Sequence, residues 1–517
     1  MAKSVTQSLG TDNIGKLLFN YATPAIIAMA SSSLYHLVDS AFVGHGVGGA
    51  AIAGMAITMP IMNIGAAFGA MVGIGAGARI SLRLGEGNKA AAEKTLCNAV
   101  ILNVIIGFTI MALMLTFLDE ILLLFSGGRA SADTLQHARE FMQIILLGNV
   151  TMHLYLGMND MIRSSGNPRK SMAIMLTSVA VNLMLNPLFI FKFGWGIRGS
   201  AAATVISQFI AFLIALSHFC SKKSFLRFKR EAFHFDWKIV GNILSIGLAP
   251  FLMNICASAV VAIINNSMSY YGGNDLYAGA FGLVNRVVLL FIMVVQGLNQ
   301  GMQPIVGYNY GAKNYARVRK VVYMTICCGV AIATFGFVLG QTMPGNIARA
   351  FVDLKKEQVN QTLAQVVEPA AVVDSVKITT SQPMEIVGNL PATDSIVVAT
   401  SEVAATKDSS LSYEARMVDE ASKGMRIVLL LFPLVGFQIV VGGFFQYIGK
   451  AKLAIFMSLT RQLLFLIPLL LVLPDKYGTY GVWISMPIAD AASIILALIL
   501  FIWQIRKIGR MDSLLKK

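Results

Sequence analysis

Hydrophobic runs of about 20 residues recur along the whole chain and are separated by short polar loops. A helix of about 20 residues crosses the ~30 Å hydrocarbon core of a bilayer, whereas transmembrane β-strands would show weaker, alternating segments of about ten residues. Because backbone polar groups in hydrocarbon have to be satisfied within the protein, the runs predict membrane-spanning helices. With 56% hydrophobic and only 13% charged residues, the chain also has too few charges to cover a soluble protein.

The runs divide the chain into twelve candidate spans, so an all-α polytopic membrane protein is the expected fold. Loops after the even-numbered spans are much richer in Lys and Arg than loops after the odd-numbered ones, which places both termini in the cytoplasm. This distribution explains the net charge of +15 without nucleic acid as a partner. The expected spans are 21–44, 50–75, 95–117, 138–158, 171–192, 199–218, 240–268, 278–305, 320–341, 424–446, 453–473 and 481–505.

The two halves of the chain resemble each other. Gly87 in LGEGNK matches Gly311 in NYGAKN at a spacing of 224 (311 − 87), whereas Gly196 matches Gly478 at a spacing of 282 (478 − 196). The difference indicates an insertion of about 58 residues (282 − 224) in the second half. It falls where the apolar pattern stops, in a polar stretch for which we expect no chemistry.

The repeat predicts two pseudo-symmetric six-helix bundles. Residues 1–218 would form the first bundle and residues 219–239 a cytoplasmic linker. The second bundle would comprise residues 240–353 and 414–517, interrupted by an extracytoplasmic loop at 354–413. Many secondary transporters are built from such repeats, with the binding site between or within the halves.

Asp39 lies in the first span, in the segment SSSLYHLVDSAFVG, which contains no other acid. An ionisable side chain in hydrocarbon costs roughly 2.5–3.5 kcal/mol or more and is therefore a candidate for function. Tyr35, one helical turn earlier, can hydrogen-bond the carboxyl group, and His36 can pair with it or relay protons. The alternative is a purely structural carboxylate held between helices by polar neighbours. We favour a functional role.

Asp490 and Arg461 lie in the last two spans. By the helical rise of about 1.5 Å per residue, Asp490 lies nearer the middle of the membrane than Arg461, and a long arginine side chain can close the gap. We favour a structural ion pair, with a role in coupling as the alternative. For Arg286 in the eighth span, snorkelling and exposure to a lumen both stay open.

Amides are the other polar groups in the spans. Asn182 and Asn186 lie one turn apart in VNLMLNPLF, and Asn265 lies in the seventh span, near the position that repeats Asp39. Buried amides join transmembrane helices or line wet cavities, and spacing alone does not decide between these roles. Asn265, together with the charged residues of the second half, forms a candidate polar site there: Asp490, Arg461 and Arg286.

Five segments together resemble the MATE family, the multidrug and toxic compound extrusion antiporters. They are LVDSAFVG in the first span, RLGEGN after the second, the loop SSGNPRKSM, the following NLMLNPLFIF, and WGIRGSAAATVIS at the sixth span. Each segment alone is modest, and their order and spacing make the match specific. The resemblance covers the chain except for the inserted loop.

The resemblance implies two six-helix lobes around a cleft that opens alternately to each side of the membrane. It also implies export of amphiphilic, often cationic, compounds in exchange for H⁺ or Na⁺. In relatives with an acid in the first span, that acid carries the coupling and a nearby proline bends the helix. Asp39 occupies the acidic position, Pro24 the proline position and Tyr35 the position one turn away. Asn182 and Thr204 match the family's polar neighbours.

Asn186 departs from the family pattern, because some relatives have an aspartate there. We therefore expect a site with one carboxylate, beside which Asn186 is a neutral neighbour. Another branch places its coupling acids in the seventh and tenth helices, and spans 240–268 and 424–446 contain none. We expect Asp39 to carry the coupling, no cofactor beyond the coupling ion, and a monomer in the inner (cell) membrane.

Two other transport functions and an enzymatic activity are the alternatives. A lipid-linked oligosaccharide flippase of the same superfamily would have a strongly cationic cavity, whereas Arg286 and Arg461 are the intramembrane bases here. A passive channel is disfavoured by the internal repeat, since channels are more often assembled from identical subunits. The histidines, His36 included, form no HExxH or comparable group, so neither an enzyme nor a metal site is expected.

Overall fold

The computed structural model describes residues 5–126, 130–222, 224–273, 275–350 and 413–515, without the side chains of residues 5–7, 33–37 and 275. These ranges contain helices and no strand. The first half comprises α1 Val5–Thr11, α2 Ile14–Gly46, α3 Gly49–Gly85, α4 Lys89–Thr116, α5 Leu118–Ser126, α6 Ala132–Leu147, α7 Asn149–Ser164, α8 Pro168–Pro187, the π-helix η1 Leu188–Lys192 and α9 Gly196–Cys220. The second half comprises η2 Arg230–Ala232, α10 Trp237–Gly272, α11 Asp275–Gly311, α12 Tyr315–Thr342, the helix Tyr413–Val428, α15 Phe432–Tyr447, α16 Ala451–Leu459, the π-helix η3 Thr460–Leu466 and α17 Ile467–Leu515.

Twelve membrane-spanning segments account for the long helices, as predicted. Eight stretches are long and apolar enough to cross a bilayer as they stand. One of these, Ala451–Leu515, is broken at Gly478 (φ 58°) and supplies two spans. Two further spans are bent helix pairs: α6 with α7, at 55°, and Tyr413–Val428 with α15, at 57°. Helix α2 completes the set.

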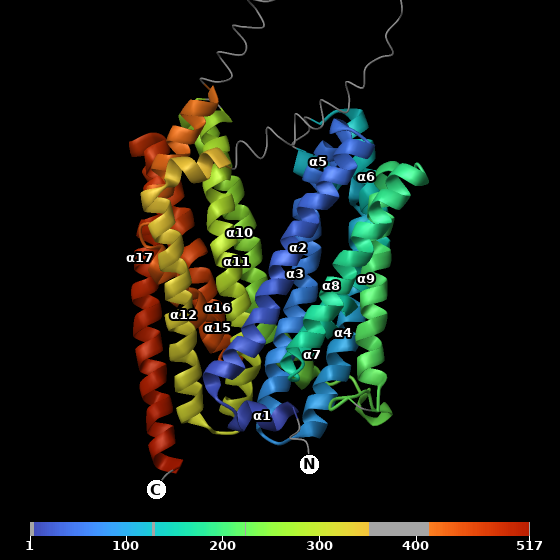
Figure 1. Ribbon diagram of the computed structural model, residues 1–517, viewed down its shortest axis with the longest axis vertical. Helices are drawn as coiled ribbons and strands as arrows, with labels where there is room; N and C mark the ends of the chain where they lie inside the picture. The colour runs from blue at the N-terminus through green and yellow to red at the C-terminus, as the bar shows by residue number, and fades with distance from the viewer. Residues whose placement is uncertain (1–4, 127–129, 223, 274, 351–412, 516–517) are drawn as a thin grey trace, which may run out of the picture.

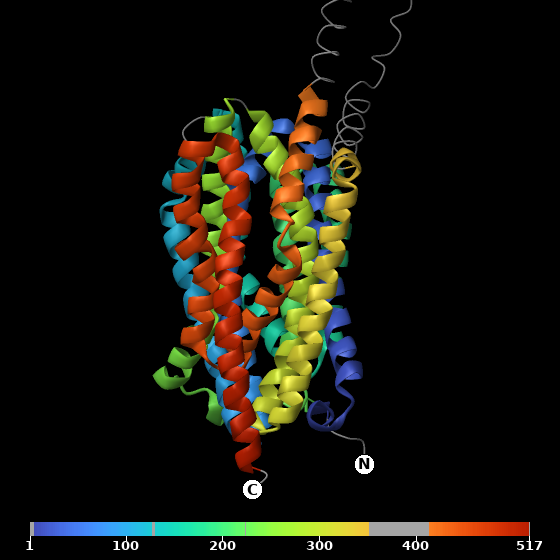
Figure 2. The same cartoon turned by 90° about the vertical axis from the view of Figure 1, so that its left-hand side faces the viewer.

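The spans form two lobes that lie side by side. Figure 1 shows α2 to α9, in blue to green, beside α10 to α17, in green to red. Both termini emerge at the same end of the molecule in both views, as an even number of spans requires (Figures 1 and 2). The predicted inserted loop, 354–413, lies outside the described residues apart from Tyr413.

Corresponding turns of the two lobes establish the spacing of the internal repeat. Helix α4 begins at Lys89 and α12 at Tyr315, 226 positions apart (315 − 89). The residue with left-handed backbone two positions earlier is Gly87 (φ 75°) in the first lobe and Lys313 (φ 60°) in the second. The predicted pairing of Gly87 with Gly311 is therefore wrong by two positions. It failed because the second lobe has a lysine, rather than the expected glycine, in the left-handed conformation.

The corrected spacing relates the first helices of the lobes residue by residue. Pro24 of α2 corresponds to Pro250 of α10, and Asp39 corresponds to Asn265 (265 − 39 = 226). Later in the chain, α8 and α16 begin 283 positions apart (451 − 168). The insertion in the second half therefore amounts to about 57 residues (283 − 226).

The lobes pack most closely at the end that carries the termini. A Cβ atom at Gly247 of α10 would lie 1.8 Å from the carbonyl oxygen of Met71 on α3. Likewise, a Cβ atom at Gly75 of α3 would lie 2.1 Å from the carbonyl oxygen of Ile243 on α10. Small residues let helix backbones approach this closely, and any side chain would force them apart. These contacts close the molecule at the terminal end.

Large apolar side chains cover the outer surface of both lobes. Phe108 on α4 is 53% exposed, Phe335 on α12 is 61% exposed and Ile495 on α17 is 61% exposed. An apolar surface of this extent is unsuited to water and matches the acyl chains of a bilayer. Polar side chains inside the lobes are therefore the exceptions that need a separate explanation.

Candidate functional site

Asp39 lies inside the first lobe and points at its neighbouring helices. It is seven residues before α2 ends at Gly46, about 10 Å along the helix axis. Its side chain is 4% exposed. Oδ1 accepts a hydrogen bond from the side-chain amide of Asn186 on α8 and a second one, 2.8 Å long, from the hydroxyl of Ser200 on α9. The carboxylate thus joins three helices and does not face lipid.

Two further side chains extend this arrangement between α8 and α9. The amide of Asn182 donates to Oγ1 of Thr204 at 3.2 Å, and the amide of Asn186 reaches Oδ1 of Asn182 at 3.5 Å. Asn182 and Asn186 are four residues apart and therefore lie on one face of α8. All these side chains are buried, with at most 4% exposed. We call Asp39, Asn182, Asn186, Ser200 and Thr204 the first-lobe cluster.

Ser200 is the member of the cluster that sequence reasoning missed. It precedes Thr204 by one helical turn in GSAAAT, the same spacing that relates Asn182 to Asn186. A search for polar residues on the face of α9 that carries Thr204 would have found it. Serine was passed over because small residues are common wherever transmembrane helices pack.

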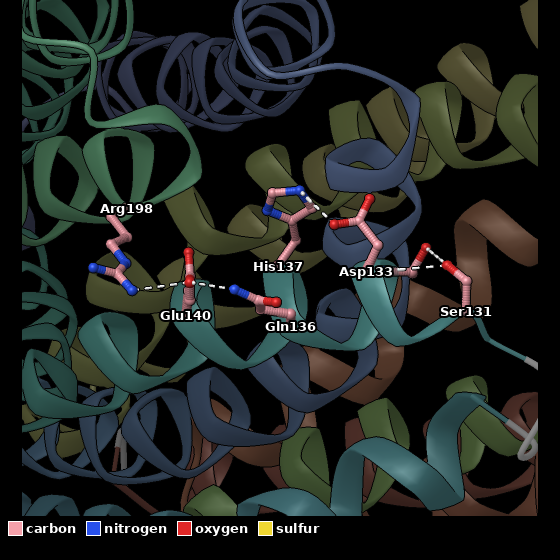
Figure 3. Close-up of polar contacts among 7 residues, drawn as sticks. Ser131, Asp133, Gln136, His137, Glu140 and Arg198 are labelled. Carbon is pink, nitrogen blue, oxygen red and sulfur yellow. Dashed lines mark hydrogen bonds and ion pairs between the residues drawn. The ribbon is translucent and has the colours of Figure 1, made fainter.

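The start of α9 is held by contacts with α6, close to Ser200. Arg198 donates to Oε1 of Glu140 at 2.9 Å, and Gln136 donates to the same oxygen at 3.3 Å (Figure 3). Ser131 caps the N-terminus of α6 by accepting the N–H of Thr134 at 3.2 Å. The Arg198 side chain is 62% exposed, so these contacts position α9 from the surface and lie outside the buried cluster.

The second lobe has no equivalent of the first-lobe cluster among the described residues. Asn265 takes the position of the acid and is exposed. Leu469 corresponds to Asn186 at the spacing of 283 (469 − 186). Val482 corresponds to Ser200 at 282 (482 − 200), the distance between the left-handed glycines that precede the final helix of each lobe. In the second lobe, other residues therefore take the places of the carboxylate and of both of its hydrogen-bond donors.

Polar groups of the second lobe gather instead around Arg461 and Asp490. Nε of Arg461 lies 2.5 Å from Oδ1 of Asp490, which is 3% exposed, so the predicted contact between the last two spans is present. Arg461 also lines a cavity of about 130 Å³ between α10, α11, α15, α16 and η3 of the second lobe and the helices α3 and α7 of the first. The cavity's amide-bearing side chains include Gln296, Asn299, Gln300, Gln303, Gln438 and Gln446.

The remaining candidate residues lie away from this cavity or have side chains outside the described residues. Asn265 and Arg286 are exposed and do not line it, so the predicted second-lobe site divides. Pro24 is buried within α2, 15 residues before Asp39 and about 22 Å from it along the axis. Tyr35 and His36 belong to α2, but their side chains lie outside the described residues.

The first-lobe cluster is suited to an acid that gains and loses charge. Asn186 and Ser200 are neutral donors, which stabilise a carboxylate without cancelling its charge. A serine hydroxyl can also turn and accept a hydrogen bond from a protonated acid. In addition, the buried Oδ1 of Asn186 has no hydrogen-bond partner in the described part of the chain.

In the described part of the chain, a duplicated bundle of twelve spans with a carboxylate held by neutral donors in the first lobe defines the class of the protein as a polytopic membrane transporter. The family model MatE matches residues 24–188 and 250–377, more than half of the chain. A structure of the MATE multidrug transporter DinF-BH is 31% identical, with a TM-score of 0.76, over 96% of this chain and 97% of that one. The chain belongs to the MatE family.

Other relatives agree with this assignment. The multidrug export protein MepA of Staphylococcus haemolyticus is 26% identical over 61% of this chain and 68% of its own length. Its counterpart from Staphylococcus aureus strain MSSA476 is 25% identical over 62% of this chain and 72% of its own length. A crystal structure of MATE in the bent conformation superposes with a TM-score of 0.82 at 19% identity, covering 99% of this chain and all of that one, and so shares the fold.

Proposed function

We propose that this chain exports amphiphilic, often cationic, compounds in exchange for H⁺ or Na⁺, and that substrate and coupling ion compete for Asp39. The observation that carries the proposal is a buried carboxylate held by Asn186 and Ser200 from two neighbouring helices. Relatives named as multidrug exporters support the choice of substrates.

Competition for one charge is enough to produce exchange. A cationic substrate is attracted to ionised Asp39, and a bound proton or Na⁺ removes that attraction. Each ligand therefore weakens the binding of the other, and this coupling is reciprocal. Neutralising Asp39 also weakens its hydrogen bonds from Asn186 and Ser200, which frees α2 to move relative to α8 and α9. Pro24 would let α2 bend during that movement.

The side of the membrane that each end of the molecule faces follows from its topology. The distribution of Lys and Arg supports a cytoplasmic location for both termini. The close contacts of Gly247 and Gly75 at the terminal end would then seal the cytoplasmic side, which makes this the outward-facing state. We expect a monomer in the cell (inner) membrane, with residues 219–239 in the cytoplasm and residues 354–413 outside.

Ethidium efflux by the Asp39→Asn variant tests the proposal. We expect proteoliposomes with the variant to lose efflux driven by a pH or Na⁺ gradient, because the asparagine side chain cannot exchange charge. Varying pH and Na⁺ independently identifies the coupling ion. Asp119→Asn is the control, since Asp119 is an acid on α5 with a 58% exposed side chain. Normal gradient-driven efflux by Asp39→Asn would refute the proposal.

A further inference from the structure

The linker between α9 and α10 is docked on the first lobe. Nζ of Lys229 lies 2.7 Å from Oε2 of Glu93 on α4, whose side chain is only 2% exposed. Asn98, also on α4, donates to the carbonyl oxygen of His234 at 3.0 Å and accepts the N–H of Asp236 at 2.8 Å. In Figure 1 the linker, in green, lies beside the lower ends of α4 and α9. These contacts hold the linker in one conformation, so its outward side chains form a fixed surface.

Three large aromatic side chains belong to this outward surface. Phe233 is 43% exposed, Phe235 is 39% exposed, and Trp237, the first residue of α10, is 78% exposed. The rings of Phe235 and Trp237 contact each other edge to face, with centroids 4.8 Å apart. Aromatic rings that are exposed to this extent are enriched where a membrane meets water, because one part of the ring contacts acyl chains while another contacts headgroups.

The contacts with Asn98 determine how deep these rings lie in the membrane. Asn98 is nine residues after Lys89, where α4 begins, which is about 14 Å along the helix axis. It is also three residues inside the predicted span 95–117. The segment that Asn98 binds, from His234 to Asp236, therefore lies close to the boundary between the hydrocarbon and the headgroups.

Cationic side chains accompany the aromatic rings. The stretch 221–238 contains six Lys and Arg and two acids, which gives a net charge of +4 (6 − 2). The two acids, Glu231 and Asp236, are exposed, and Asp236 accepts the N–H of Lys238 at the start of α10. The exposed bases other than Lys229 are Lys222, Arg227, Arg230 and Lys238. Positive charge is thus in excess beside the rings.

The corresponding segment of the first lobe lacks this combination. At the spacing of 226, Phe235 corresponds to Leu9 (235 − 9) and Trp237 corresponds to Thr11 (237 − 11). Leu9 is 0% exposed and belongs to α1, which packs against α11 of the second lobe. The aromatic and basic surface is therefore a property of the linker and is not shared by every helix that enters the membrane at this end.

We propose that the linker binds the headgroup of an anionic phospholipid in the leaflet at the end that carries the termini. The residues of this linker surface are Arg227, Arg230, Phe233, Phe235, Trp237 and Lys238. The aromatic rings lie at the level of the headgroups, and the two guanidinium groups donate to the phosphate oxygens in the bidentate manner that favours arginine at phosphates. A zwitterionic phospholipid offers the same phosphate with a compensating amine, so it binds this basic surface more weakly.

The fluorescence of Trp237 reports which lipid lies beside the linker surface. The full-length protein is reconstituted in bilayers that mix phosphatidylglycerol with phosphatidylcholine, and either lipid is brominated near the headgroup end of its acyl chains to quench nearby tryptophan. Subtracting the signal of Trp237→Phe isolates Trp237. The test variants are Arg227→Gln/Arg230→Gln and, with the charge retained, Arg227→Lys/Arg230→Lys. Arg506→Gln/Arg510→Gln is the matched control, because it removes two exposed arginines of α17 at the same end of the molecule.

We expect the wild type to bind phosphatidylglycerol beside Trp237 about fivefold or more tightly than phosphatidylcholine, and the glutamine variant to bind the two lipids within about twofold of each other. The lysine variant and the control should keep the preference of the wild type. Equal quenching by the two brominated lipids in the wild type would overturn the proposal. So would the same preference in the glutamine variant as in the wild type, or a lysine variant without preference, because the linker charge would then not select the lipid.

Discussion

The hydroxyl of Ser200 donates a 2.8 Å hydrogen bond to Oδ1 of Asp39, from a helix that begins only four residues earlier at Gly196. The turn before α9 therefore determines where the donor meets the acid. Through this bond and the one from Asn186, the charge state of Asp39 is linked to the packing of α2 against α8 and α9.

Replacing Ser200 by alanine should slow gradient-driven efflux. The variant loses one of the two hydrogen bonds that hold the Asp39 carboxylate against α8 and α9. A hydrogen bond to a charged group contributes about 1.5–3 kcal/mol, so we expect initial rates of ethidium efflux to fall about tenfold. Ser207→Ala is the control, because Ser207 is buried on the same helix and donates to the Thr204 carbonyl instead. Unchanged efflux by Ser200→Ala would show that its hydroxyl does not influence the acid.

Within the amide pair, Asn186 should matter more than Asn182. Asn186 donates directly to Asp39, whereas Asn182 donates to Thr204 and accepts from Asn186 at 3.5 Å. We expect Asn186→Leu to reduce gradient-driven efflux about tenfold or more, and Asn182→Leu to reduce it by a smaller factor. Initial rates of ethidium efflux at matched protein amounts give the comparison. A larger loss in Asn182→Leu would contradict this order.

Gly247→Ala should destabilise the observed arrangement of the lobes. The new methyl group would lie 1.8 Å from the Met71 carbonyl oxygen, so α3 and α10 must separate. Overpacking of this kind typically costs about 1–3 kcal/mol, and we expect a lower melting temperature together with slower transport. Gly241→Ala on the same helix meets nothing within 4 Å and should behave as the wild type. Equal melting temperatures for the two variants would argue against close packing at Gly247.

Neutralising one partner of the Arg461–Asp490 pair should lower the stability of the protein more than neutralising both partners. Asp490→Asn leaves a cation inside the bundle, which costs about 3–5 kcal/mol in buried pairs. Arg461→Gln/Asp490→Asn leaves no uncompensated charge and should recover most of the thermal stability. Melting temperatures in detergent measure the difference. A double variant less stable than the single one would indicate that the pair itself stabilises the fold.

The twelve helices could be predicted from the sequence because hydrophobic runs of bilayer length are a direct physical requirement. Their ends were less predictable, since α3 continues to Gly85, ten residues beyond the predicted span 50–75. The predicted alignment of the two lobes was also wrong by two positions, because Lys313 adopts the left-handed conformation that Gly87 adopts in the first lobe. The geometry of the turn determines that conformation, and the residue types alone do not reveal it.

The candidate site was predictable where one helix face carries several polar residues, as with Asn182 and Asn186. Ser200 was not predicted as a site residue, because the sequence does not show which of many small residues contacts Asp39 in space. The cavity at Arg461 was not predicted for a similar reason. Its lining combines α3 and α7 of the first lobe with five helical segments of the second, and no spacing along the chain reveals that they converge.

In the proposed mechanism, substrate and coupling ion exclude one another at Asp39. Its most direct test is the release of the coupling ion when ethidium is added to purified protein in weakly buffered detergent solution, followed with a pH indicator or a Na⁺-selective electrode. We predict that the wild type releases up to one ion per bound ethidium and that Asp39→Asn releases none. Ethidium binding by the wild type without release of either ion, or equal release by Asp39→Asn, would contradict the account.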